Sequence, residues 1–283
     1  MKFKVFYIKI HLANYLTKVG FFIYGEKRVS LSLNGKKGII IGVANEQSIA
    51  FGCAKALHAA GAEIAMTYQN EKALPFVEPL AKAVDAKVFM PCNVVRQGEL
   101  EAFFKAVEDK WGQIDFVIHS IAWSPINELH GRVVDSTTEG FCKAMDISCH
   151  SFIRMAKLAE PLMKNGGSLI TMSYYGAEKV VDHYNMMGPI KASLESTVRY
   201  LASELGSNNI RVNCVSPGPM MTRASSGIDN FSRLVESAKE QSPLKRLCTI
   251  EEVGDMTAFL VSPLSSAITG SVHYVDAGHN IMA

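Results

Sequence analysis

From residue 35 onward, the chain alternates short apolar runs with longer segments whose apolar residues recur at helical spacing. Residues 38–42 include three consecutive isoleucines, as in a strand that is buried on both faces. The following segment, 48–60, has helical spacing and stops at Gly61. The same reading predicts strands at 38–42, 63–68, 86–90, 114–119, 168–172, 210–215 and 272–275, and helices at 48–60, 71–83, 99–111, 141–163 and 190–205.

Seven strands separated by helices predict an α/β fold with a doubly wound parallel sheet of the Rossmann type. Each crossover is long enough for a parallel return, and no linker or repeat divides the sequence. We therefore expect a single domain over residues 33–283. The irregular stretch that begins at Pro217-Gly218-Pro219 is expected to form a substrate lid around 217–235, because loops of that length in compact domains are usually functional.

Composition and charge narrow the class of protein. With 283 residues, of which 48% are hydrophobic and 20% charged, the chain can bury a core without a metal or a disulfide. Its net charge of +2 argues against a strongly basic nucleic-acid binder. Residues 1–28 differ, with six basic side chains against one acidic, so we expect 1–32 to be a basic, poorly ordered extension. A targeting peptide or a nucleic-acid contact are the alternatives for this extension.

The sequence carries no signal for a membrane span or a metal site. Its longest run without charge, 256–275, is interrupted by Pro263 and Gly270. The six cysteines form no C-x-x-C pair, which indicates reduced thiols in a cytoplasmic protein. The eight histidines show no metal-ligand spacing, so we expect no metal.

The turn after the first predicted strand is a candidate dinucleotide site. Gly42 allows a close backbone approach, and the amides of Ser48 and Ile49 would face a pyrophosphate at the first helix. The segment departs from G-x-G-x-x-G, and a plain tight turn is the alternative. Gln69 follows the second strand, where an acidic residue usually binds the ribose. Because no cation stands there to bind a 2′-phosphate, the sequence favours NADH over NADPH.

Tyr184 and Lys191 lie seven residues apart. On one helix they would share a face two turns apart, about 10 Å along the axis. A lysine near a phenol lowers the cost of the phenolate and offers a positive charge to ribose hydroxyls. The alternative is that both are ordinary positions at the start of a helix.

These features belong to a series in fixed order: 42–50, 67–70, 119–121, Tyr174, the Tyr184 and Lys191 pair, 210–213 and 217–219. With this series the chain resembles the short-chain dehydrogenase/reductase superfamily. Within it, the chain closely resembles the bacterial NADH-dependent enoyl-acyl-carrier-protein reductases, from about Leu33 to the C-terminus. Most short-chain dehydrogenases place the catalytic tyrosine four residues before the lysine, where this chain has Met187.

The resemblance implies NADH-dependent reduction of the trans-2 double bond of enoyl-acyl-carrier-protein thioesters. This is the final reductive step of each elongation cycle in bacterial type II fatty acid biosynthesis. By resemblance, Tyr184 donates a hydrogen bond to the enolate, Lys191 holds the nicotinamide ribose and Tyr174 is a second tyrosine of the site. The displacement of the tyrosine has a physical reading. A carbonyl reductase delivers hydride to the carbonyl carbon itself. Here hydride would enter at the β-carbon, so the thioester oxygen lies two bonds further from the nicotinamide. A phenol moved by about 5 Å along the helix would stay beside that oxygen.

The resemblance also supplies the remaining site residues. It implies NADH contacts from Gly42, Ser48, Ile49, Gln69, Asn93, Val94, Ser120, Ile121, Lys191, Met220, Met221, Thr222, Arg223 and Ala224. It implies substrate contacts from Ser124, Tyr174, Tyr184, Met187, Ile228 and Phe231. The expected partner is an acyl-carrier protein with an enoyl chain, and the expected assembly is a homotetramer.

Some residues depart from the family pattern. Asn93 replaces the usual aspartate, and Pro189 follows Tyr184 closely, which a helix tolerates only in its first turn. Asp229 stands where the family often has a cation for carrier docking, so Arg233, or Lys245 with Arg246, would serve instead.

Two other functions stay open at this stage. A carbonyl-reducing enzyme such as a 3-oxoacyl-carrier-protein reductase is one, although Met187 at the usual tyrosine position argues against it. A catalytically silent dinucleotide sensor is the other, and the intact Tyr184 and Lys191 pair argues against that reading.

Overall fold

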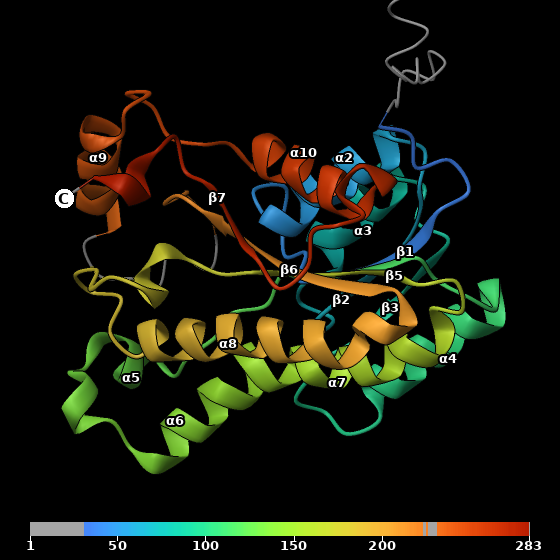
Figure 1. Ribbon diagram of the computed structural model, residues 1–283. Helices are drawn as coiled ribbons and strands as arrows, with labels where there is room; N and C mark the ends of the chain where they lie inside the picture. Colours follow the sequence, from blue (N-terminus) through green and yellow to red (C-terminus); the bar gives the residue numbers. More distant parts are fainter. Residues whose placement is uncertain (1–30, 223–224, 226–230, 283) are drawn as a thin grey trace, which may run out of the picture. The chain divides into compact units, whose positions relative to one another are not determined.

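The computed structural model describes residues 31–222, 225 and 231–282, and these contain a sheet of seven parallel strands (Figure 1). The order across the sheet is β3-β2-β1-β4-β5-β6-β7, with the reversal of winding between β1 and β4. This confirms the doubly wound fold and all seven predicted strands. The strands are β1 (Lys37–Ile41), β2 (Glu63–Tyr68), β3 (Val88–Pro91), β4 (Phe116–His119), β5 (Gly167–Met172), β6 (Ile210–Pro217) and β7 (Val272–Val275).

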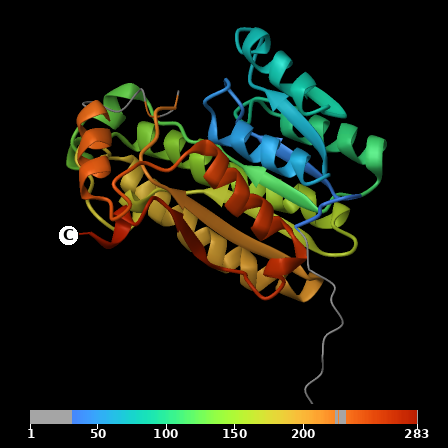
Figure 2. The ribbon, with the colours of Figure 1, turned by 90° about the horizontal axis from the view of Figure 1, so that it is seen from above.

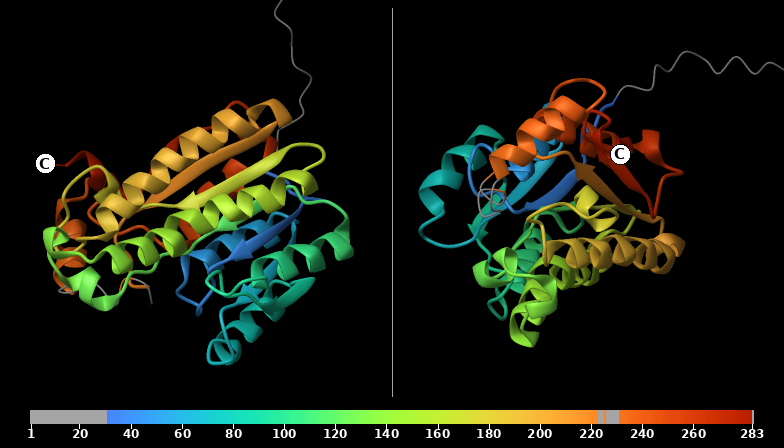
Figure 3. Two further views of the ribbon diagram at one scale, coloured as in Figure 1. Left: turned by 90° about the horizontal axis from the view of Figure 1, so that it is seen from below. Right: turned by 90° about the vertical axis from the view of Figure 1, so that its left-hand side faces the viewer.

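Helices cover both faces of the sheet. Three helices pack on one face, α2 (Ile49–Ala59), α3 (Leu74–Ala83) and α10 (Ile250–Val261), and Figure 2 shows α10 beside α2. The other face carries α4 (Glu99–Trp111), α7 (Ser151–Ala159) and α8 (Met187–Leu205), seen from below in the left panel of Figure 3. Each layer buries its own apolar cluster against the sheet, which is why the central strands are apolar on both faces.

The predicted helix 141–163 is in part wrong. Its residues belong to α6 (Thr138–Met145), a π-helical turn (Asp146–His150), α7 and a short 3₁₀ turn that ends at Leu162. A further short helix, α5 (Ile126–His130), precedes α6. The π-helical turn inserts an extra residue into the helical ladder, which is a change that apolar spacing does not reveal.

Two helices between residues 228 and 272 were not predicted, α9 (Phe231–Gln241) and α10. Thr249 and Glu252 form a capping box at the start of α10. Gly254 weakens the helical signal, but it lets α10 approach α2 closely. A Cβ there would lie 2.5 Å from the carbonyl oxygen of Gly52. Contact between two helices therefore outweighs local propensity at this position.

The described residues also bear on the wider predictions. No helix among them is long and apolar enough to cross a bilayer, and their His, Cys, Asp and Glu side chains form no cluster suited to a metal. All six cysteines are free thiols, and only Cys142 is exposed. The compact unit covers Leu31–Ala283, whereas the structure of the extension lies outside the described residues.

Candidate functional site

A cavity of about 180 Å³ lies at the carboxyl ends of the central strands, where doubly wound sheets bind their ligands. It brings together ten of the predicted site residues: Ile49, Ser120, Ile121, Ser124, Tyr174, Tyr184, Met187, Lys191, Met220 and Thr222. The prediction missed other lining residues: Ala122, Trp123, Leu129, Met172, Ser173, the segment 217–219, Ser225 and Leu234. Most of these are sequence neighbours of predicted residues, so the prediction located the cavity but did not name all of its lining residues.

The remaining predicted residues do not line this cavity. Ser48 and Met221 are sequence neighbours of lining residues, and Gly42 follows β1. Gln69 follows β2, and Asn93 and Val94 follow β3. Arg223, Ala224, Ile228 and the side chain of Phe231 lie outside the described residues. The roles of these residues stay predictions.

Tyr184 lies in a turn that precedes α8, as the predicted helix 190–205 allowed, so the condition that it shares a helix with Lys191 is not met. Its two neighbours adopt left-handed backbone conformations, with φ of +63° at His183 and +41° at Asn185. Such conformations are costly for residues other than glycine and concentrate at functional sites. The Nδ2 of Asn185 donates to the carbonyl of Leu129 at 2.8 Å and so anchors this turn.

Pro189 is the third residue of α8. It therefore lies in the first turn, where the missing N–H has no partner within the helix. The structure thus confirms that Pro189 lies where a helix tolerates proline.

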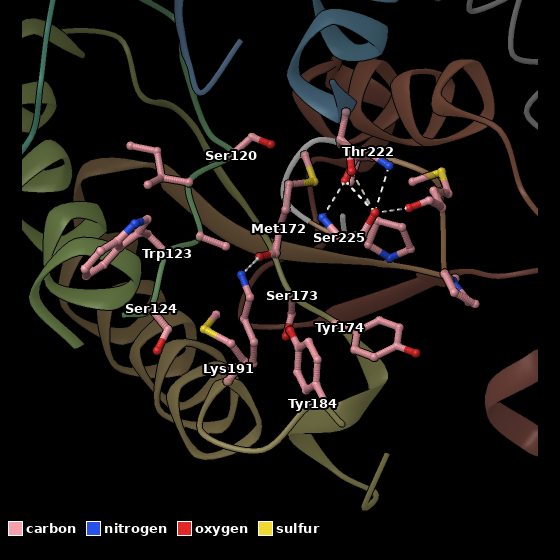
Figure 4. Close-up of a pocket in the computed structure, with 18 of the residues that line it drawn as sticks. Ser120, Trp123, Ser124, Met172, Ser173, Tyr174, Tyr184, Lys191, Thr222 and Ser225 are labelled. Carbon is pink, nitrogen blue, oxygen red and sulfur yellow. Dashed lines mark hydrogen bonds between the residues drawn. The ribbon is translucent and has the colours of Figure 1, made fainter. Parts of the chain in front are cut away.

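The Tyr184 ring is 8% exposed and packs against the Tyr174 ring, with centroids 4.8 Å apart (Figure 4). Burial raises the pKa of the Tyr184 phenol, and Tyr174 and Glu195 raise it further. The phenol is therefore neutral at physiological pH and able to donate a hydrogen bond. Gly176 leaves room for the ring, because a Cβ there would lie 2.5 Å from Tyr184 Cδ1.

Tyr174 shares this wall of the cavity but differs in what its hydroxyl does. Burial raises the pKa of Tyr174, and no polar atom among the described residues forms a hydrogen bond with its hydroxyl. In Figure 4 that hydroxyl points away from Lys191. The observed role of Tyr174 is therefore to pack against the Tyr184 ring.

Lys191 reaches the cavity from α8 and is 4% exposed. Its Nζ donates to the carbonyl oxygen of Met172 at 2.7 Å, at the end of β5. Burial lowers the pKa of Lys191 to about 8. The ammonium thus sits in a fixed position with two further N–H groups to offer a ligand.

A polar network behind β4 fixes the loop at 120–124. The His119 ring is fully buried, with one nitrogen 2.8 Å from Thr171 Oγ1 and the other 2.8 Å from Ser151 Oγ. Burial lowers the pKa of His119 to about 3, so the imidazole is neutral. From the π-helical turn, Ser148 Oγ accepts from the Trp123 amide and donates to the Trp123 carbonyl, both at 2.8 Å. These contacts hold the cavity wall that Trp123 and Ser120 form.

The first turn fits a dinucleotide by the shape of its backbone. Gly42 has φ of +119°, and a Cβ there would lie 2.1 Å from the carbonyl oxygen of Ser120. Ser48 Oγ accepts from the amides of Ala44 and Asn45 at 3.0 Å, and the Ser48 amide donates to the Asn45 carbonyl at 3.1 Å, so this residue shapes the turn. The first turn of α2 has no acidic residue that would oppose an anion at the helix N-terminus.

The segment after β3 is held from two sides. Asn93 Oδ1 accepts from the Val95 amide at 3.1 Å, and the Asn93 amide donates to Glu99 Oε2 at 2.7 Å. From α7, Arg154 Nη1 donates to the Val94 carbonyl at 2.8 Å. The side-chain oxygen of Asn93 thus accepts a hydrogen bond within its own turn. No sequence pattern predicted the contact with Arg154, which lies 60 residues after Val94.

The structure weakens part of the docking prediction. Arg246 forms two hydrogen bonds with Glu252, at 2.6 and 2.9 Å, and Lys245 Nζ donates to the Glu240 carbonyl at 2.8 Å. Both side chains therefore stabilise the start of α10 and the end of α9. Arg233 is exposed on α9 and stays a candidate for carrier docking.

The chain is similar to known proteins over most of its length. A family described as Enoyl-(Acyl carrier protein) reductase matches residues 42–280. The chain is 50% identical over 248 residues to enoyl-[acyl-carrier-protein] reductase [NADH] 1 of Rhizobium meliloti, covering 88% of this chain and 91% of that protein.

Two solved structures of this kind are also similar to the chain. The reductase of Anaplasma phagocytophilum, in complex with NAD, has a TM-score of 0.85 and 48% identity, covering 88% of this chain and 95% of the other. The NADH reductase of Aquifex aeolicus has a TM-score of 0.86 and 44% identity, covering 90% and 99%.

Proposed function

The chain belongs to the enoyl-acyl-carrier-protein reductase family, and on that premise we propose how its residues carry out the reaction. The protein is an NADH-dependent enoyl-acyl-carrier-protein reductase of fatty acid biosynthesis. It reduces the trans-2 double bond of an enoyl thioester. The observation that carries the mechanism is the convergence of a neutral Tyr184 phenol and a buried Lys191 ammonium on one cavity.

NADH, when bound, supplies the hydride for the β-carbon of the substrate. Gly42 and the amide of Ile49 would hold its pyrophosphate beside Ser48, whose own amide donates to the Asn45 carbonyl, and Lys191 would hold the nicotinamide ribose. Gln69 and the segment of Asn93 and Val94 would contact the adenosine. Each of these assignments uses a position at the carboxyl edge of the sheet.

Tyr184 would donate a hydrogen bond to the thioester oxygen as negative charge develops there. A preorganised donor in a site from which water is excluded stabilises that charge strongly. The α-carbon of the resulting enolate then takes a proton from solvent water, which completes the reduction. A buried phenol with a raised pKa suits this role, because it stays protonated throughout.

The neighbouring apolar residues would bind the acyl chain. Met187 stands where a carbonyl-reducing relative would carry its tyrosine, and here it lines the cavity with Leu129 and Ser124. Among the described residues, Tyr174 and Tyr184 supply the only phenols of the cavity, and neither occupies the position of Met187. We therefore propose the enoyl thioester rather than the 3-oxoacyl thioester as substrate.

A steady-state assay tests this proposal directly. The protein should oxidise NADH rapidly with a short trans-2-enoyl thioester and at a rate near background with the matched 3-oxoacyl thioester. The same assay with NADPH should give a much lower kcat/KM. Faster turnover of the 3-oxoacyl thioester would overturn the proposal.

The acyl-carrier protein is the natural carrier of the substrate, and we propose that it docks beside α9, where Arg233 is exposed. A homotetramer and a cytoplasmic location also stay predictions. Sedimentation of the purified protein tests the first, and fractionation of the source cells tests the second.

A further inference from the structure

Helix α8 carries a buried carboxylate that the proposed mechanism does not use. Glu195 lies four residues after Lys191, and the two are 5% and 4% exposed. Residues four apart on a helix share a face. Both side chains therefore reach from α8 to the end of β5.

The two side chains contact consecutive residues. Lys191 Nζ donates to the carbonyl of Met172 at 2.7 Å, and Ser173 Oγ donates to Glu195 Oε1 at 2.5 Å. Met172 ends β5, and the residue after Ser173 is Tyr174. Helix α8 is thus tied to the strand end at the two residues that precede the tyrosine wall of the cavity (Figure 4).

Lys191 needs a counter-charge because it is buried. Burial lowers its pKa, whereas Cys214 on β6, Cys149 in the π-helical turn and Glu195 raise it. His119 on β4 also faces the ammonium, but it is neutral. Burial raises the pKa of the Cys214 thiol, which carries no charge at physiological pH. Glu195 is the one carboxyl group among the residues that raise the pKa of Lys191.

Burial raises the pKa of Glu195 overall, and its polar neighbours offset part of that cost. Burial raises the pKa of Glu195 and the nearby Glu178 adds to this, whereas the Ser173 hydrogen bond, Arg199 and Lys191 lower it. A hydroxyl donor and two cations thus oppose the cost of burial. Tyr184, Cys214 and Tyr274 also lie within electrostatic reach of this carboxylate.

We propose that Glu195 and Ser173 are positioning residues for the reduction, an inference that rests on the function proposed above. Their hydrogen bond holds the end of β5 against α8, so that the Met172 carbonyl aims Lys191 at the cofactor ribose. The carboxylate also supplies the negative charge that keeps the buried ammonium protonated.

Glu195→Gln tests the charge, because glutamine can still accept from Ser173 Oγ. Without the carboxylate, Lys191 loses its proton at a lower pH, and the alkaline loss of kcat/KM moves to lower pH. NADH affinity, measured by fluorescence titration without substrate, should fall roughly tenfold at about pH 8.5 and less than about twofold at about pH 6.5.

Ser173→Ala tests the hydrogen bond and leaves the charge in place. Alignment of Lys191 is lost at every pH, so kcat should fall roughly five- to tenfold with the alkaline limb unmoved. The two variants therefore separate the two parts of the proposal. Ser173→Ala also keeps the test possible if Glu195→Gln fails to fold.

Glu204→Gln is the matched control, since it removes the same charge from an exposed position on the same helix. It should match the wild type in every measurement. If Glu195→Gln gives the same alkaline limb and the same NADH titrations as Glu204→Gln, the proposal is wrong. Failure of the wild type to reduce an enoyl thioester would instead overturn the proposed function, and the NADH titrations would still test Glu195.

Discussion

The two sides of the proposed site differ in what they offer a ligand. At the turn between β1 and α2, the proposed binding element is the backbone. Gly42 adopts φ of +119°, and Ser48 turns its hydroxyl back onto the amides of its own loop. At the end of β5 and the start of α8, the proposed binding elements are buried side chains. Tyr184 and Lys191 are 8% and 4% exposed, and each has a shifted pKa.

Because of this difference, we expect substitutions on the two sides to change different properties of the protein. A backbone cradle has little chemistry of its own, so a change there should alter cofactor binding and stability. Buried side chains with shifted pKa values act on the charge of the reacting atoms, so a change there should alter turnover. The predictions below test that division, from the largest expected effect to the smallest.

Tyr184→Phe should give the largest effect. Loss of one preorganised donor to a developing oxyanion lowers kcat roughly 100- to 1,000-fold. NADH affinity should stay within about twofold of the wild type, because the phenol binds substrate rather than cofactor. Steady-state kinetics and fluorescence titration measure the two quantities.

Tyr200→Phe is the control for this variant, since Tyr200 is 70% exposed on the same helix. It should leave kcat unchanged. Full turnover in Tyr184→Phe would contradict the mechanism and would favour a protein that binds the dinucleotide without reducing a substrate.

Gly42→Ala should lower NADH affinity roughly tenfold or more and destabilise the fold by about 2–4 kcal/mol. The new Cβ would meet the Ser120 carbonyl at 2.1 Å, and alanine is strained at a φ of +119°. Gly35→Ala isolates the backbone effect, because Gly35 has φ of +77° with open space around it. That control should lose only about 1 kcal/mol. Thermal unfolding and NADH titration decide between them, and equal losses would contradict the cradle.

Apolar patterning predicted the sheet well because every central strand is buried on both faces. It failed where contacts between distant residues decide the local structure. Gly254 is a poor helix former, yet α10 runs through it because it packs against Gly52 of α2. The turn of Tyr184 depends on left-handed conformations at His183 and Asn185, which no spacing rule indicates.

The site shows the same limit. Tyr184 and Lys191 line one cavity, although Tyr184 lies before α8 and Lys191 within it. The contact between Ser173 and Glu195 joins residues 22 apart, and that of Arg154 with Val94 joins residues 60 apart. Neither follows a periodic pattern, since each depends on how the layers of the fold pack together.

Gly176→Ala should lower kcat roughly tenfold and leave NADH affinity within about twofold. Its Cβ would lie 2.5 Å from Tyr184 Cδ1, so the ring must move away from the position in which it donates. A shift of about 1 Å in a catalytic group can cost this much. Gly206→Ala, with open space around the new Cβ, should keep full activity. A Gly176→Ala enzyme as fast as this control would show that the ring position tolerates displacement.

Arg154→Gln should give the smallest effect and tests whether a side chain can act on the cofactor side through the backbone alone. Arg154 Nη1 donates to the Val94 carbonyl, so its loss should free the segment after β3. One hydrogen bond is worth about 1 kcal/mol, which predicts a KM for NADH roughly fivefold higher at unchanged kcat. Arg132→Gln, at an exposed ion pair with Asp135, should change neither constant. A fall in kcat at an unchanged KM would place Arg154 with the catalytic side of the cavity and would break the division between backbone and side chains.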